Sequence, residues 1–213
     1  MKYLDLENWK RKKHFEFFKK YEYPHFTICA NVDITNTFRY SKENKHSLFQ
    51  TVLFAIMKCG NEIEEFRYRI VEDKVVIYDT VHPGITYIVQ DDVYTNCVID
   101  YKPKLSDFLE EFERVIEKAK LSIILGTEED NKFDLIYVSS LPWISFTTAT
   151  NPVKLGYEDS VPRLIFGKHF KQGKRIMMPF SVQVNHCLMD GIHVSKYFYK
   201  LTELLSNPEK YFN

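Results

Sequence analysis

The chain has 213 residues, of which 45% are hydrophobic and 27% are charged, as is usual for a globular protein with a substantial core. Its 29 Lys and Arg residues balance 29 Asp and Glu residues, which removes the basic footprint expected of a nucleic-acid-binding protein. No apolar run approaches the roughly 18 residues that a membrane-spanning helix needs, so we predict one globular domain over residues 1–213.

The targeting and redox signals of the sequence agree with each other. The first twenty residues contain no apolar signal core, so we expect a protein that stays in the cytoplasm. The four cysteines lie far apart and form no CxxC pair: Cys29, Cys59, Cys97 and Cys187. We interpret them as reduced thiols and not as a disulfide or zinc framework.

Apolar periodicity predicts four helices, in residues 5–20, 48–60, 104–121 and from residue 192 onward. Ser47 and Ser106 are candidate N-caps of the second and third helices, and Gly60 is a candidate stop. Six strands are predicted, in residues 66–71, 74–81, 85–90, 133–140, 162–170 and 175–185. The short links around residues 72–74 and 171–174 indicate hairpins.

This order of elements lacks the regular alternation of strand and helix that a doubly wound fold requires. We therefore predict an α+β fold, a two-layer sandwich in which helices pack on a mixed β-sheet. The polar connectors at residues 41–47 and 125–133 are too short to be domain linkers.

Several common functional motifs are missing from the sequence. It contains no GxxxxGK[ST] phosphate loop, no GxGxxG after a strand, no HExxH zinc motif and no GxSxG nucleophile elbow. The remaining candidate for chemistry is the stretch "SVQVNHCLMDGIHVSKYF" near the C-terminus.

His186 lies in this stretch, at the end of a predicted strand and before a predicted helix. It is compatible with a histidine that merely satisfies a turn, with Asp190 capping the next helix. It is also compatible with a general base, since a rigid strand places an imidazole well and imidazole exchanges protons near neutral pH. A metal site with Asp190 and His193 is a third reading, although the three side chains need not converge.

The same stretch resembles the signature of the chloramphenicol acetyltransferases, QVHHxxxDGFHxxxF. Four further segments match that family in the same order: "LENWKRKKHFEFF", "IEEFRYRIVEDKVVIYDTVHPGITYIV", "VSSLPWISFT" and "FGKHFKQGKRIMMPFSVQV". The motif HxxxDG alone is shared by other CoA-dependent acyltransferases, including the catalytic domains of 2-oxoacid dehydrogenase complexes. The further segments and the chain length make the narrower family the better match.

The resemblance implies an O-acetyltransferase that uses acetyl-CoA as co-substrate and no metal. His186 would take the proton from the 3-hydroxyl of chloramphenicol, which would attack the thioester directly. Ser139 would donate a hydrogen bond to the oxyanion. Asp190 would be structural and would pair with Arg11, because a buried carboxylate needs a cationic partner.

The resemblance also implies positions for the two substrates. Phe17 and Phe18 would line the acceptor pocket, with Tyr94 as a weaker match, and Trp143 would lie near the CoA arm. The family forms trimers with each active site between subunits, so the resemblance implies a homotrimer as the active form. No nucleic acid or membrane is an expected partner.

The sequence departs from the family pattern at several positions. Asn185 replaces the first histidine of the usual pair, Ile165 replaces a threonine near the oxyanion, and Phe18 stands where a tyrosine is common. Residues 147–164 lack the family's FxLN pattern. Two alternatives therefore remain: an acetyltransferase for a different hydroxyl acceptor, and a CoA-binding homologue without catalysis.

Overall fold

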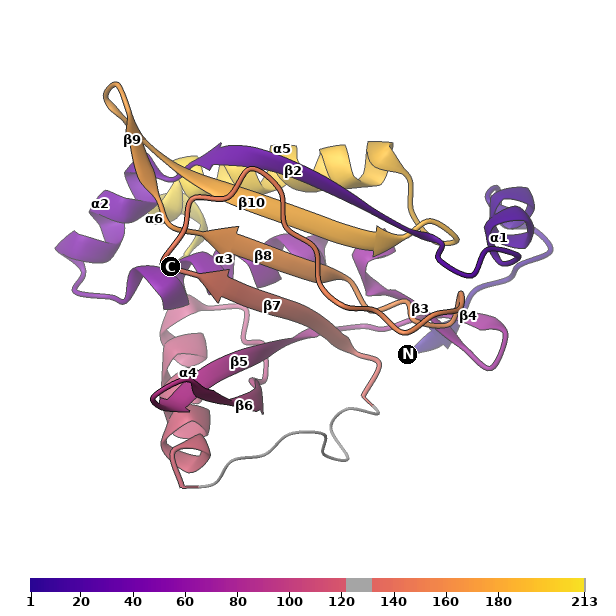
Figure 1. The fold of residues 1–213 in the computed structure, drawn as a ribbon, viewed down its shortest axis with the longest axis horizontal. Coiled ribbons are helices and arrows are strands. Elements are labelled where there is room, and N and C mark those ends of the chain that lie inside the picture. The colour runs from indigo at the N-terminus through magenta and orange to yellow at the C-terminus, as the bar shows by residue number, and fades with distance from the viewer. Residues whose placement is uncertain (122–131, 213) are drawn as a thin grey trace.

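A computed structural model describes residues 1–121 and 132–212 of the chain. Its centre is a mixed sheet of seven strands in the order β2-β10-β8-β7-β5-β6, with β9 paired to one end of β10 (Figure 1). The strands are β2 (His25–Asp33), β5 (His82–Gln90), β6 (Val93–Val98), β7 (Leu135–Leu141), β8 (Arg163–Gly167), β9 (Phe170–Gln172) and β10 (Arg175–Asn185). The β5-β7 and β7-β8 pairs are parallel and the others antiparallel.

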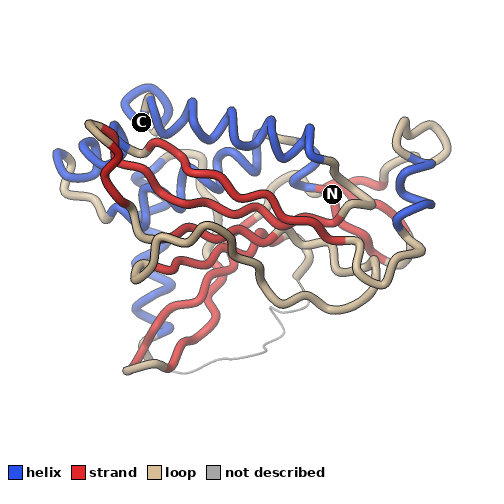
Figure 2. Tube along the Cα trace, turned by 45° about the horizontal axis from the view of Figure 1, so that its top comes forward, coloured by secondary structure: helices blue, strands red, loops and turns tan. Residues whose placement is uncertain are grey.

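Helices cover one face of this sheet, while a long connecting segment crosses the other (Figure 2). The helices on this face are α2 (Thr35–Glu43), α3 (Leu48–Glu62), α4 (Leu105–Ala119) and α5 (Gly191–Ser206), with the short α6 (Pro208–Tyr211) and a 3-10 turn at Glu64–Arg67. Helix α1 (Lys12–Phe18) lies beyond one end of the sheet (Figure 1). A small second sheet has the order β1-β4-β3, from β1 (Lys2–Tyr3), β3 (Tyr68–Val71) and β4 (Lys74–Ile77). The predicted α+β sandwich is confirmed.

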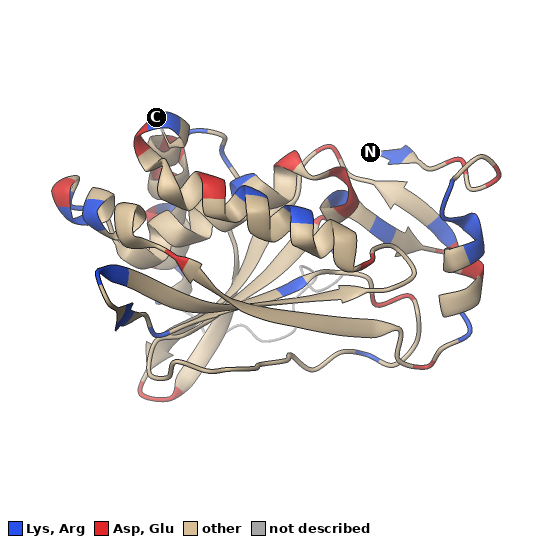
Figure 3. Ribbon diagram, turned by 90° about the horizontal axis from the view of Figure 1, so that it is seen from above, with Lys and Arg blue, Asp and Glu red and all other residues tan. Residues whose placement is uncertain are grey.

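The core lies between the sheet and the helices. Alternate residues of the central strands, such as Val138 on β7 and Val182 on β10, point into it and are almost fully buried. Tyr197 of α5 is also fully buried and stacks on Phe66, with ring centroids 4.4 Å apart. Charged side chains are concentrated on helices and loops, and the middle of the long strands is nearly free of them (Figure 3).

The two predicted hairpins are present. Val71 pairs with Lys74 across a turn in which Glu72 and Asp73 both have positive φ, 48° and 63°, which is the twist that suits a two-residue hairpin. In the second hairpin Gly173 takes the positive φ, 60°.

Three details of the predicted helices are wrong. The first helix spans only seven residues, because Asp5 binds the backbone of Glu7 and the side chain of Asn8 in a separate turn. Gly60 does not stop α3, which continues to Glu62; a Cβ on Gly60 would lie 2.6 Å from Ile136 Cδ1, so glycine allows the helix to approach β7. Ser106 lies inside α4, and its hydroxyl donates to Asp107.

The Ser47 prediction is right in position, since Ser47 immediately precedes α3, but its side chain makes no capping hydrogen bond. The predicted loop at residues 125–133 lies almost entirely outside the described residues. Within the described ranges, no helix is long and apolar enough to cross a membrane.

Candidate active site

The turn that follows β10 holds His186 in a fixed place. The backbone N–H groups of Leu188 and Met189 both donate to the carbonyl of Asn185, at 3.1 Å each, which closes the turn. The backbone N–H of His186 donates to the carbonyl of Pro24 at 2.6 Å, which ties the turn to the start of β2. The long buried strand is therefore followed directly by His186, whose backbone is fixed by the closed turn and by the start of β2.

The neighbours of the His186 ring define its tautomer. Its Nδ1 lies 3.0 Å from the carbonyl oxygen of Met189 and 3.1 Å from Oδ1 of Asp190. Both atoms accept hydrogen bonds and neither donates one, so Nδ1 carries the hydrogen. Within the part of the chain that the structure describes, Nε2 has no hydrogen-bond partner. The lone pair of Nε2 is thus available to accept a proton.

Two aromatic rings fix the plane of the imidazole. Phe18 of α1 stacks on His186 with ring centroids 3.9 Å apart and 11° between the planes, and Phe26 of β2 lies 4.7 Å away. The histidine side chain keeps 32% of its surface exposed. Phe17 lies further out: it packs edge-on against Phe18 at 5.1 Å and is 54% exposed.

Asp190 and Arg11 form a two-point ion pair behind the histidine. Nη1 and Nη2 of Arg11 each donate to one oxygen of Asp190, the latter at 3.0 Å, and Nη2 also lies 3.4 Å from the carbonyl of His186. Burial acts to raise the pKa of Asp190, but the hydrogen bond and charge of Arg11 outweigh it and lower that pKa below its ordinary value. The carboxylate is therefore ionised beside His186.

Asp190 also begins α5, as expected from the sequence. Its backbone N–H donates to Nδ1 of His193 at 2.9 Å, so that His193 completes a capping box at the first turn. Nε2 of His193 points away from Asp190 and lies 3.5 Å from Glu65, and burial lowers the pKa of this histidine. Among the described residues, no group of three potential ligands gathers around a possible metal ion.

Ser139 lies far from His186 within the chain. On the face of the sheet that the helices do not cover, Ser139 of β7 is level with Ile165 of β8, which is level with Ser181 of β10. His186 is five residues beyond Ser181, which is roughly 17 Å along the strand, and the two strand spacings add about 10 Å sideways. The structure therefore does not bring the two predicted catalytic side chains together within a single chain.

Ser139 instead lines two cavities that meet at its position. The larger, of about 740 Å³, extends toward the end of β7 and is also lined by Tyr94, Trp143 and Ile165. Trp143 is 68% exposed and Tyr94 is 46% exposed. Tyr94, predicted on the acceptor side, thus shares a cavity with Trp143, predicted on the CoA side.

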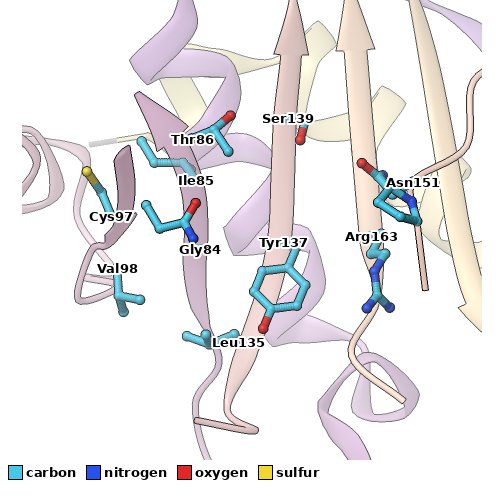
Figure 4. A pocket seen from close by; sticks show the side chains of 12 residues that line it. Gly84, Ile85, Thr86, Cys97, Val98, Leu135, Tyr137, Ser139, Asn151 and Arg163 are labelled. Atoms are coloured by element: carbon cyan, nitrogen blue, oxygen red, sulfur yellow. The ribbon is translucent and has the colours of Figure 1, made fainter. Parts of the chain in front are cut away.

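The smaller cavity, of about 260 Å³, extends from Ser139 in the other direction (Figure 4). Tyr137, Asn151 and Arg163 line it together with Gly84. Gly84 is level with Tyr137, and a Cβ there would lie 2.9 Å from that ring, so glycine makes room for the tyrosine. Figure 4 shows Tyr137 and Arg163 side by side on adjacent strands below Ser139.

The 142–162 segment, which joins β7 to β8, is fastened to the sheet by polar side chains of β10. The hydroxyl of Ser181 donates to the carbonyl of Ala149 at 2.7 Å, and the backbone N–H of Asn151 donates to Oε1 of Gln183 at 2.9 Å. Ser181 and Gln183 are both only 1% exposed. These buried polar groups alternate with apolar ones, and this alternation is the signal from which their partner segment could have been expected.

Asn185 makes the third and most connected of these attachments. Its amide donates to the carbonyls of Tyr157, at 2.7 Å, and Asp159, at 3.1 Å. Its side-chain oxygen accepts from the N–H of Cys187, at 2.9 Å. The residue that departs from the family motif therefore joins the His186 turn to the 142–162 segment.

Comparison with solved structures identifies the fold class. The fold is that of the CoA-dependent acyltransferases: a dihydrolipoamide acetyltransferase from Azotobacter vinelandii superposes with a TM-score of 0.72 at 20% identity, covering 95% of this chain and 89% of that one. A solved chloramphenicol acetyltransferase superposes more closely, with a TM-score of 0.88 at 29% identity over 96% of this chain and 99% of that one.

The sequence comparisons identify the family within this fold class. The family model for chloramphenicol acetyltransferase matches residues 1–202, so the chain belongs to that family. Chloramphenicol acetyltransferase 3 of Escherichia coli is 26% identical over 97% of this chain and 98% of its own length. A chloramphenicol acetyltransferase of Proteus mirabilis is 29% identical over 91% and 89%. The protein is thus an acetyltransferase of this type, and the family uses acetyl-CoA as co-substrate.

Proposed function

We propose that the protein transfers the acetyl group of acetyl-CoA to the 3-hydroxyl of chloramphenicol, as a homotrimer with each active site between two subunits. The observation that carries the proposal is the free Nε2 of His186, held by its two neighbours at Nδ1 on the end of a buried strand. Membership of the family supports the choice of both substrates.

The proposed reaction needs one proton relay and no covalent enzyme intermediate. Nε2 of His186 takes the hydroxyl proton while the acceptor oxygen attacks the thioester carbonyl, and the hydroxyl of Ser139 donates to the resulting oxyanion. Collapse of the tetrahedral intermediate breaks the carbon–sulfur bond, and the imidazolium returns its proton to the departing CoA thiolate. A positioned base contributes about 10²–10⁴-fold to the rate, and an oxyanion donor about 10²–10³-fold.

The separation of His186 from Ser139 supports a site shared between subunits. Each half of the site is open and bordered by exposed apolar side chains, which a subunit contact would cover. On the His186 side these are Phe17, Tyr21 and Tyr23, and on the Ser139 side Ile88, Tyr94, Trp143 and Ile144. In a closed ring, the His186 half of one subunit would complete the Ser139 half of the next.

The two cavities at Ser139 suit two substrates that meet at one reacting carbon. In this arrangement Trp143 borders the CoA arm in the larger cavity, and the acceptor occupies the smaller one. Phe17 and Phe18 would close the acceptor pocket from the neighbouring subunit, and Tyr94 would contact the substrates from the larger cavity. The need for acetyl-CoA is consistent with the expected cytoplasmic location.

The direct test is release of free CoA thiol from acetyl-CoA in the presence of chloramphenicol. Wild-type protein should release thiol above the acceptor-free blank, and His186→Ala should lower kcat by about 10²–10⁴-fold. His14→Ala, which changes an exposed histidine on α1, is the matched control and should retain activity. Equal activity of wild type and His186→Ala would refute the assignment of the base.

A second candidate function keeps this chemistry and changes the acceptor. Arg163 and Asn151 place polar groups in the otherwise mainly apolar smaller cavity, and Ile165 brings no hydroxyl to the neighbourhood of Ser139. A panel of hydroxylated acceptors tests this candidate: efficient thiol release with another alcohol, and none with chloramphenicol, would select it.

A further inference from the structure

Arg163 is the most strongly polar group in the smaller cavity, and its surroundings leave part of it available. Its side chain is 11% exposed, and its guanidinium lies over the ring of Tyr137, 5.4 Å from the centroid. A guanidinium carries five N–H donors in a fixed plane. The number and direction of the donors already in use therefore define what a ligand can bind.

Three of these five donors have partners in the chain. Nη1 donates to Oδ1 of Asp159 at 2.9 Å and to the carbonyl of Val161 at 3.0 Å, and Nη2 donates to Oδ2 of Asp159 at 2.8 Å. Asp159 thus occupies the end of the guanidinium. The two remaining N–H groups, on Nε and Nη2, have no partner among the described residues. They lie in the guanidinium plane and point in parallel from the same edge of the group.

Asp159 is itself held firmly, so Arg163 is oriented before any ligand arrives. The carbonyl of Asp159 accepts from Nε2 of His25 at 2.7 Å and from the amide of Asn185 at 3.1 Å. Its carboxylate also accepts from the backbone N–H of Lys154 at 2.7 Å. Such support by neighbouring hydrogen bonds is what a preorganised recognition site requires.

We propose that Nε and Nη2 of Arg163 bind a planar group with two acceptor oxygens, such as a nitro or carboxylate group, on the acceptor substrate. A fork of two parallel donors matches two oxygens on one atom. Because Asp159 already balances the charge of Arg163, the ligand need not be an anion, and a neutral group with two acceptor oxygens can also bind. The proposal makes Arg163 a specificity residue, and it rests on the proposed function only in placing the acceptor in this cavity.

The spacing from Ser139 to Arg163 fits an acceptor that spans both. Arg163 is level with Tyr137, two residues before Ser139, on the adjacent strand. Two residues and one strand spacing separate their Cα atoms by roughly 8 Å. The acceptor would therefore place its reacting hydroxyl near Ser139 and its two-oxygen group about one aromatic ring further down the cavity.

Binding to a catalytically inactive protein tests the fork without relying on turnover. The probes are chloramphenicol, its analogue with the nitro group reduced to an amine, and its analogue with a carboxylate in place of the nitro group. Calorimetry would compare His186→Ala with His186→Ala/Arg163→Lys, because lysine keeps the charge for Asp159 but has no fork. His186→Ala/Arg114→Lys, which makes the same change at an exposed ion pair on α4, is the matched control.

With Arg163 present, at least one two-oxygen probe should bind about ten-fold more tightly than the amine, as expected for hydrogen bonds to a charged group. Arg163→Lys should remove this preference and leave binding of the amine unchanged, while Arg114→Lys preserves it. A tighter carboxylate would identify an anionic acceptor, and a tighter nitro compound a neutral one. Three results would overturn the proposal. They are the same preference in the protein with Arg163→Lys, equal binding of all three probes by the protein that keeps Arg163, and no binding of any probe.

This outcome is separate from that of the thiol-release assay. A loss of fold in Arg163→Lys would be visible in its thermal unfolding, and a purely structural effect would weaken all three probes alike. Inactive wild-type protein would refute the proposed function and leave the binding preference measurable.

Discussion

Replacing Asp190 with alanine removes the carboxylate that binds Arg11 at two points. The Arg11 side chain is 13% exposed and that of Asp190 29%, so the variant leaves a mostly buried guanidinium with the carbonyl of His186, 3.4 Å away, as its remaining partner. Removing one member of a buried ion pair costs about 3–5 kcal/mol, and the partial exposure of Asp190 places the loss near about 3 kcal/mol. Loss of the N-cap of α5 adds about 1 kcal/mol to the expected decrease in the free energy of unfolding.

Asparagine separates these two effects. Asp190→Asn keeps a good N-cap and loses the charge, so its free energy of unfolding should lie about 1 kcal/mol above that of Asp190→Ala. Denaturant unfolding measures both variants against wild type. Asp79→Ala, which removes an exposed partner of the N-terminus, is the control and should change stability little.

The stability difference should depend on pH in a defined direction. Arg11 lowers the pKa of Asp190 in the folded protein, so its ionised form stabilises the fold above the ordinary value of 3.8. As the pH falls through the lower folded-state pKa, that contribution is lost. The gap between wild type and Asp190→Asn should therefore narrow below pH 3.8. A gap of less than about 0.5 kcal/mol at pH 7, within the range of ordinary surface changes, would refute the reasoning.

Three further outcomes follow from the site. Ser139→Ala should lower kcat by about 10²–10³-fold without changing the unfolding midpoint, because an oxyanion donor acts on the transition state; an unchanged kcat would contradict its role. Phe18→Ala should lower kcat, since the ring stacked on His186 is lost, and Phe18→Tyr should restore it; steady-state kinetics compare the two. A thiol reagent should modify Cys29 first in the native protein, because the other cysteines are buried and burial raises the pKa of Cys187 to about 12; mass spectrometry of the labelled protein would show the order.

The sequence predicted the elements that its local patterns encode. These elements are formed by residues close together in the chain, and they include the apolar strand before His186, the helix after Asp190 and the hairpin at Glu72 and Asp73. The strand β2 (His25–Asp33) was missed, because its burial does not alternate clearly and its pairing with β10 comes from 140 or more residues away. The helix α2 (Thr35–Glu43) was missed because its sequence is mostly polar.

The site was predictable in its parts and not in its arrangement. The resemblance to the family implied the Arg11–Asp190 pair, and the structure contains it. The distance between His186 and Ser139 depends on strand order and register, which periodicity does not reveal. The two free donors of Arg163 were not foreseen either, because they depend on Asp159, which binds the end of the guanidinium. The carbonyl of Asp159 is in turn held by His25 of β2 and Asn185 of β10, which lie far from it in the sequence.

The measurement that bears most directly on the proposed site between subunits combines two variants, each of which should be inactive alone. His186→Ala and Ser139→Ala would be unfolded together in equal amounts, refolded and assayed for thiol release with acetyl-CoA and chloramphenicol. If each site takes His186 from one subunit and Ser139 from its neighbour, random mixing restores both residues in about a quarter of the sites, and activity rises to about a quarter of wild type. If both residues served one active site within a single chain, no mixture of the two variants would exceed the activity of either one alone.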